Sequence, residues 1–154
     1  MKTFIFFLFV LFSFSVQAQD SKGSNPPDNC EGNSFRLDAV RNKWKESQLL
    51  NEKGVVILVA RLGKVESDNR LNQRRLYTAS KYLNIAKSNV VTSQGEKTDE
   101  LGVVEVYVAG VLIESLTVKN CEDLRVGICD NDLEDNKRYQ LPKPKLKIKC
   151  RQQK

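Results

Sequence analysis

Residues 55–60 read Val-Val-Ile-Leu-Val-Ala, an uninterrupted apolar run that is rich in β-branched side chains. Glycines bound the run on both sides, at Gly54 and Gly63. An apolar run of this length between turn residues is typical of a strand buried on both faces, because a strand with one exposed face alternates apolar and polar residues. The sequence therefore predicts that this strand forms the centre of a sheet.

A helix is expected on each side of this strand. Ser34 is a suitable cap for a helix that runs to about Asn51, and Asp68 or Asn69 for a second helix that ends near Leu83. Both segments carry apolar residues at intervals of three and four, which form one apolar stripe on a helix. These residues are Leu37, Val40 and Trp44 in the first segment and Leu76, Ala79 and Leu83 in the second.

Three further strands are expected beyond the second helix. Residues 90–92 form a short β-branched run, and residues 103–108 alternate valine with Glu105 and Tyr107. Residues 111–118 follow after Ala-Gly, which allows a tight turn and a hairpin although it is not the favoured turn pair. This order of elements predicts an α+β domain in which helices pack on one face of a small mixed β-sheet.

Composition limits the chemistry that this chain can perform. The 154 residues suit one domain, and 25 Lys and Arg against 19 Asp and Glu give a net charge of +6. Because the chain has no histidine, mechanisms that use a histidine base, a Ser-His-Asp triad or a histidine metal ligand are excluded. Catalytic glycine-rich and C-x-x-C motifs are absent from the sequence as well. We therefore expect a protein that is not an enzyme and that uses no metal or cofactor.

The ends of the chain have their own composition. Residues 1–18 have a basic start, an apolar run and a Val-Gln-Ala cleavage site, which predicts a secretory signal peptide. Residues 19–33 are rich in Ser, Gly, Asn and Pro and predict a linker. The α+β domain is expected over residues 34–118, followed by a basic, cysteine-containing extension over residues 119–154. The apolar run is shorter than the roughly 20 residues that span a bilayer, so no transmembrane segment is expected after cleavage.

The four cysteines predict two disulfides, because disulfides persist in exported proteins. They are Cys30, Cys121, Cys129 and Cys150. Three pairings are possible, and the sequence does not decide between them. Cys121 with Cys129 closes a short local loop and leaves Cys30 with Cys150 to join the ends of the domain, so this pairing is the one favoured here.

The second helix carries the most informative motif. Residues 71–83 read Leu-Asn-Gln-Arg-Arg-Leu-Tyr-Thr-Ala-Ser-Lys-Tyr-Leu, which resembles the helix signature of the OmpA-like peptidoglycan-binding domain. In that family a buried strand precedes the helix, a short strand follows it, and a Val-Glu-Val strand closes the sheet. Similar segments occur here in the same order, and the resemblance covers residues 55–108. It implies an OmpA-like βαβ-β arrangement, with an additional N-terminal helix and a disulfide-tied C-terminal extension in this chain.

The resemblance also implies a ligand and a set of binding residues. Arg75 is similar to the family arginine that pairs with the diaminopimelate carboxylate of the peptidoglycan stem peptide, and an arginine fork suits a carboxylate. The family's ammonium-binding Asp is missing from the loop after the first strand, where only Glu66 or Asp68 can replace it. Arg61 is expected near the same end of the sheet, where it adds positive charge that favours an anion.

Other interpretations of these segments stay open. Arg75 is also explained as a solvated arginine, or as one that pairs locally with Glu66 or Asp68, without contact to a ligand. Residues 130–136 begin like a calcium loop but lack the required glycine and glutamate, so an acidic turn is favoured. The alternating lysines of residues 143–149 are typical of a guarded edge strand or of a cationic strip that attracts anionic polymers. Nucleic acid is excluded as a partner because the chain is expected to be exported and no aromatic platform accompanies the lysines.

Taken as a whole, the sequence predicts an exported, periplasmic or extracellular binding protein of the cell envelope. The first hypothesis is non-covalent association with peptidoglycan, or with another anionic envelope polymer, through Arg75. The alternative is a secreted or periplasmic protein-interaction scaffold that has lost wall binding, since a fold does not fix a function.

Overall fold

The computed structural model describes residues 29–50, 54–127 and 129. The predicted signal peptide, nearly all of the predicted linker and the segment from residue 130 onward lie outside the described residues, as do Cys150, the acidic turn and the alternating lysines. None of the described helices is long and apolar enough to cross a membrane.

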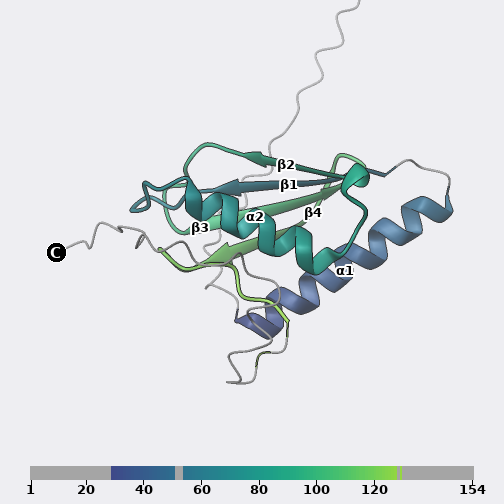
Figure 1. Ribbon diagram of the computed structural model, residues 1–154, viewed down its shortest axis with the longest axis horizontal. Helices are drawn as coiled ribbons and strands as arrows, with labels where there is room; N and C mark the ends of the chain where they lie inside the picture. Colours follow the sequence, from purple (N-terminus) through teal and green to yellow (C-terminus); the bar gives the residue numbers. More distant parts are fainter. Residues whose placement is uncertain (1–28, 51–53, 128, 130–154) are drawn as a thin grey trace, which may run out of the picture.

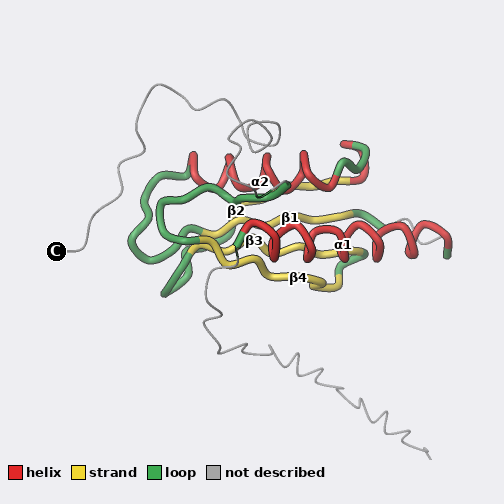
Figure 2. Tube along the Cα trace, turned by 90° about the horizontal axis from the view of Figure 1, so that it is seen from below, coloured by secondary structure: helices red, strands yellow, loops and turns green. Residues whose placement is uncertain are grey.

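The described chain forms one mixed four-stranded sheet with two α-helices, which confirms the predicted α+β class (Figure 1). The elements in chain order are α1 (Cys30–Leu49), β1 (Val56–Arg61), α2 (Arg70–Leu83), the short 3-10 helix η1 (Lys87–Asn89), β2 (Val90–Gln94), β3 (Gly102–Val108) and β4 (Val111–Val118). The strands lie in the order β2, β1, β3, β4 (Figure 2). β2 runs parallel to β1, whereas β3 is antiparallel to both β1 and β4.

The hydrophobic core lies between the sheet and the two helices. Alternate residues of β1 and β3 point into it, among them Leu58 and Val104, and both are 0% exposed. The opposite face of β1, which carries Ile57, Val59 and Arg61, is only half-buried. β1 is thus an inner strand, as predicted, but it is not buried on both faces, because both helices cover the same side of the sheet.

α1 begins earlier than the capping pattern predicts. The side chain of Asn29 accepts a hydrogen bond from the Gly32 N–H at 2.7 Å, so the helix is capped five residues before the expected cap, Ser34. The hydroxyl of Ser34 lies inside the helix and donates to the Cys30 carbonyl at 2.9 Å. The predicted linker boundary at residue 33 is therefore wrong, because Asn29 is the better placed capping residue.

α2 and the hairpin follow the predictions closely. α2 ends at Leu83, and the next residue, Asn84, has the left-handed conformation that often stops a helix. At the hairpin, Ala109 and Gly110 both have positive φ angles, of 50° and 81°. These angles belong to the tight turn that matches the twist of paired strands, so the Ala-Gly hairpin is confirmed.

The segment after β4 belongs to the packed domain. Leu124 and Val126 are 0% and 1% exposed and are part of the hydrophobic core. The expected boundary at residue 118 is therefore too early. Their burial was not visible in the sequence because this stretch has no helical or strand periodicity.

The disulfide pattern differs from the favoured pairing. Cys30 is bonded to Cys129, with the two Cα atoms 5.6 Å apart. Cys121 is also disulfide-bonded, and no described cysteine is a free thiol. The favoured pairs Cys121–Cys129 and Cys30–Cys150 are therefore wrong. The reason is spatial, since the segment after β4 runs back to the first turn of α1 and brings Cys129 to Cys30.

Candidate functional site

The centre of the predicted site is a buried ion pair. Arg75 lies on the face of α2 that meets the sheet, and Glu66 lies in the connection from β1 to α2. Both side chains are 0% exposed. Arg75 Nη1 donates to Glu66 Oε2 at 2.8 Å, and Arg75 Nη2 donates to Glu66 Oε1 at 2.6 Å. The guanidinium thus binds a carboxylate of the same chain. It does so in the fork geometry that was expected for its contact with a ligand carboxylate.

Backbone groups complete the pair. Arg75 Nε and Nη2 donate to the Glu122 carbonyl at 3.1 and 2.9 Å. Glu66 accepts the Gly63 N–H at 2.7 Å and the Cys121 N–H at 2.6 Å. The pair therefore joins three segments that are distant in sequence: the connection after β1, the helix α2 and the chain beyond β4.

These contacts keep Glu66 ionised. Burial by itself would raise the pKa of the Glu66 carboxyl, but the hydrogen bonds and charge of Arg75, together with the Gly63 and Cys121 N–H groups, outweigh it and lower the pKa from its ordinary value of 4.5. A buried carboxylate with this many donors is a fixed anion. It provides the charge that Arg75 needs in order to stay buried.

Gly102, at the start of β3, is required by the same pair. A Cβ atom at this position would lie 2.2 Å from Arg75 Nη1 and 3.0 Å from Glu66 Oε2. We expect Gly102→Ala to lower the free energy of unfolding by about 2–3 kcal/mol, because the added methyl displaces a buried charge pair. The measurement is urea unfolding of the two proteins under identical conditions.

Gly110 offers the matched control for this substitution. A Cβ atom there meets nothing within 4 Å, so Gly110→Ala carries only the strain of its φ of +81°. That strain costs on the order of 1 kcal/mol. Equal losses in Gly102→Ala and Gly110→Ala would show that the space around Arg75 is not tightly filled.

The other predicted cation lies elsewhere. Arg61 is on the opposite face of the sheet, where its Nε and Nη2 donate to the Glu105 carboxylate at 3.1 and 3.2 Å. The Tyr107 hydroxyl donates to the same carboxylate at 3.0 Å. Burial and the Glu105 charge raise the pKa of Tyr107, so this hydroxyl stays protonated. Arg61 and Arg75 therefore do not form one cationic pocket.

Asp68 has a local role at the start of α2. Its carboxylate accepts the Arg70 N–H at 3.0 Å and pairs with the Arg70 guanidinium. These bonds lower the pKa of Asp68. Of the four predicted site residues, only Glu66 and Arg75 contact each other, and Asp68 and Arg61 each pair with a different partner.

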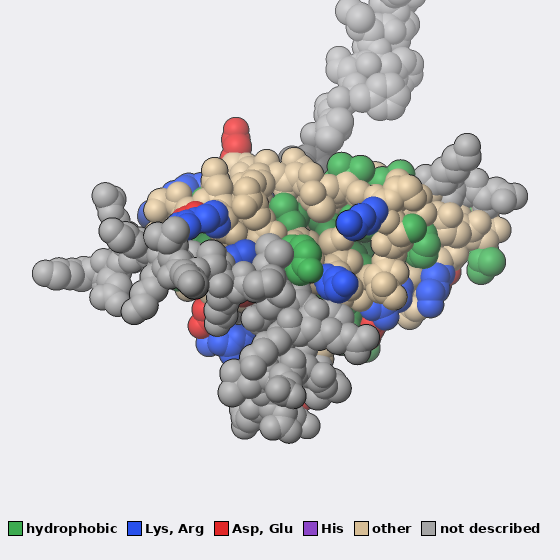
Figure 3. Space-filling view, viewed as in Figure 1, with side chains coloured by type: hydrophobic (Ala, Val, Ile, Leu, Met, Phe, Trp, Pro, Cys, Tyr) green, Lys and Arg blue, Asp and Glu red, His purple; other side chains and the backbone are tan. Residues whose placement is uncertain are grey.

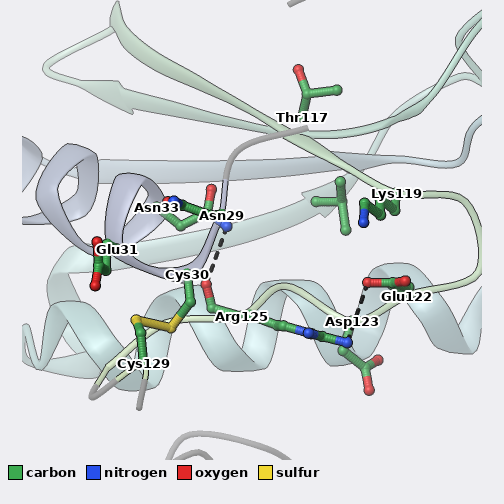
Figure 4. A pocket seen from close by; sticks show the side chains of 11 residues that line it. Asn29, Cys30, Glu31, Asn33, Thr117, Lys119, Glu122, Asp123, Arg125 and Cys129 are labelled. Carbon is green, nitrogen blue, oxygen red and sulfur yellow. Dashed lines mark hydrogen bonds and ion pairs between the residues drawn. A yellow bond between two sulfur atoms is a disulfide. The ribbon is translucent and has the colours of Figure 1, made fainter. Parts of the chain in front are cut away.

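A separate hollow of about 380 Å³ lies beside the first turn of α1 and the Cys30–Cys129 disulfide (Figure 4). Asn33 lines it, is 3% exposed, and donates from Nδ2 to the Arg125 carbonyl at 3.1 Å. The lining also carries Glu31, Glu122 and Lys119. Together with Asp123 and Arg125, these residues give three acidic and two basic side chains, so the hollow has no strong charge of one sign. No sequence pattern indicated this hollow, because its walls come from both ends of the described domain.

Among the described residues, no group of three or more His, Cys, Asp or Glu side chains lies close enough together to hold a metal ion.

Comparisons of the chain with protein-family models, with curated proteins and with solved structures find no match. A functional proposal therefore rests on the arrangement of the chain's own side chains.

Proposed function

We propose that this chain is an exported protein-interaction domain in which Arg75 stabilises the fold instead of holding a ligand. The observation that carries the proposal is the complete burial of Arg75 and Glu66, whose charged groups bind each other and the backbone. An external carboxylate would have to displace Glu66 to reach the guanidinium. Leaving either buried charge unpaired is costly, so this exchange is unfavourable.

Two features support export. The Cys30–Cys129 disulfide is of the kind that persists in an oxidising compartment. The predicted signal peptide of residues 1–18 agrees with it. A periplasmic or extracellular location follows from both features as part of the proposal.

The proposed ancestry is a divergent OmpA-like domain. The order of β1, α2 and a parallel β2, followed by the Val-Glu-Val strand β3 antiparallel to β1, supports this resemblance. Peptidoglycan binding through Arg75 stays a prediction of the resemblance, and the buried pair is the argument against it. We favour the alternative, in which the scaffold is retained for contact with proteins and performs no catalysis.

Co-sedimentation with diaminopimelate-type peptidoglycan tests this proposal. We expect any pelleting of the exported chain to be released by moderate salt and to be insensitive to free diaminopimelate. The chain has a net positive charge, and Arg75, the predicted carboxylate-binding residue, is buried and already paired with Glu66. Arg61→Gln is the companion variant, since it removes the other predicted cation without touching Arg75. Pelleting that resists salt and is competed by diaminopimelate would overturn the proposal and restore wall binding.

A further inference from the structure

Among the residues that the structure describes, one edge of the sheet lacks the usual protection against pairing with another strand. β2 forms an edge strand with the sequence Val-Val-Thr-Ser-Gln, which contains no charge and no proline, and its residues after Val90 are all exposed. Its pairing with β1 is regular from Val90 to Gln94, without a bulge. Soluble proteins usually guard such an edge with lysine, proline or a bulge, because its free backbone groups attract another strand.

The other edge strand shows these protections. β4 carries a register irregularity opposite Val106 and Tyr107. Arg36 of α1 donates to the Ser115 carbonyl of β4 at 3.2 Å and lies 3.6 Å from the Glu114 carboxylate. Within the described part of the chain, a charged side chain thus covers the β4 edge, whereas β2 carries no charged residue of its own.

The direction of the backbone groups of β2 can be determined from its neighbour. The Gly95 N–H donates to the Ala60 carbonyl of β1 at 2.9 Å. Because backbone groups alternate in direction along a strand, those of Ser93 also face β1, and those of Thr92 and Gln94 point to the open edge. Val90 has the same direction as Thr92, but its N–H already donates to the Lys87 carbonyl.

This set of open groups is self-complementary. If two copies pair β2 with β2 in antiparallel fashion about a twofold axis at Thr92, each Thr92 N–H meets the Thr92 carbonyl of the other copy. Each Gln94 N–H then meets the opposing Val90 carbonyl. The Val90 N–H already donates to the Lys87 carbonyl of η1, so the opposing Gln94 carbonyl gains no hydrogen bond from the other copy. Directly opposed threonines are also a favourable cross-strand pair.

The surface beside β2 suits this arrangement. A groove of about 590 Å³ runs between α2 and β2, and its lining is uncharged: Gln73, Leu76, Tyr77, Ser80, Thr92, Ser93 and Gln94. Tyr77 is 38% exposed there, and Val91 on the other face of β2 is 51% exposed. The edge that carries β2 is largely uncharged in Figure 3. Two copies of a chain with net charge +6 repel each other elsewhere, so an uncharged strip is where they can meet.

We propose that this chain forms a homodimer by antiparallel pairing of β2 with β2, which joins the two sheets into one and closes the groove around Tyr77. The isologous contact uses the same strand of both copies, as a twofold dimer requires. This inference goes beyond the proposed interaction role. It rests on β2 and the groove beside it and not on Arg75, so it is independent of the peptidoglycan result.

Sedimentation velocity over a concentration series tests the dimer, with the exported chain and its disulfides intact. We expect dimer for the unmodified chain. Thr92→Pro removes an outward N–H from each copy, and Thr92→Lys places two positive charges at the axis, so each should raise the dimer dissociation constant at least tenfold. Val111→Lys adds the same charge at the β4 edge, where Val111 is 62% exposed, and should leave the dimer unchanged.

Amide hydrogen exchange identifies the surface involved. Protection of the Thr92 and Gln94 amides should appear at high concentration and disappear on dilution, whereas the Ser93 amide stays protected at both. A chain that is monomeric up to its solubility limit would overturn the proposal. A dimer without concentration-dependent protection at Thr92 and Gln94, or one that Val111→Lys weakens as much as Thr92→Lys, would overturn it too.

Discussion

Arg75→Ala is expected to lower the free energy of unfolding by about 3–5 kcal/mol, because it leaves Glu66 as an unpaired charge in the interior. This loss of stability is larger than the loss expected when an exposed arginine is replaced by alanine. It removes the two bonds to Glu66 and also the contacts with the Glu122 carbonyl, which anchor the chain beyond β4 to α2. Urea unfolding followed by the fluorescence of Trp44 measures it.

Arg61→Ala is the matched control. Arg61 also pairs with a carboxylate in fork geometry, but its side chain is 32% exposed and lies on the open face of the sheet. Half-exposed pairs contribute little, so we expect a loss of less than about 1 kcal/mol. If Arg75→Ala and Arg61→Ala lower the free energy of unfolding equally, burial does not account for the contribution of the Glu66–Arg75 pair to stability.

The pH dependence checks that the loss in Arg75→Ala comes from charge. Because folding lowers the pKa of Glu66, its stabilising contribution is present above the ordinary value of 4.5 and is lost as the pH falls toward the pKa of the folded state. In Arg75→Ala the lone carboxylate is relieved when it takes up a proton. The stability difference between the two proteins should therefore narrow below pH 4.5.

Local patterns predicted which segments form helices and strands, although not where α1 begins, and the burial of Arg75 shows where such patterns fail. The apolar run of β1, the stripe of α2 and the Ala-Gly hairpin each depend on neighbours in sequence, and each was predicted. Arg75 occupies a position of the α2 stripe, four residues from both Leu71 and Ala79, and this spacing was the available signal for its burial. Its interpretation also needed Gly102 of β3, which leaves room for the guanidinium, and the Glu122 carbonyl beyond β4. No local pattern places either of them beside α2.

The predicted disulfide pairing was wrong for a related reason. The favoured pairing minimised the length of one loop, but Cys129 is carried to α1 by the packing of Leu124 and Val126 in the core. A short loop is a property of the unfolded chain. The observed pairing of Cys30 with Cys129 depends instead on which segments lie close together in the folded chain.

Replacing both Cys30 and Cys129 by serine is expected to lower the free energy of unfolding by about 3–5 kcal/mol, because the bond closes a loop with a sequence separation of 99. In the loop-entropy account a long loop gains the most from a cross-link, and the double substitution leaves no new free thiol. Urea unfolding measures the loss. Hydrogen exchange in the first turn of α1 shows whether this end of the helix opens first.

Hydrogen bonds hold the same junction and must be separated from the cross-link. The Gly127 N–H donates to Ser34 Oγ at 2.9 Å, and Asn33 Nδ2 donates to the Arg125 carbonyl. Ser34→Ala removes the first of these bonds and should cost about 1 kcal/mol. If the double cysteine variant loses no more than Ser34→Ala, local contacts alone hold α1 to the chain beyond β4. A loss several times larger means that the covalent bond makes this junction part of the folded domain.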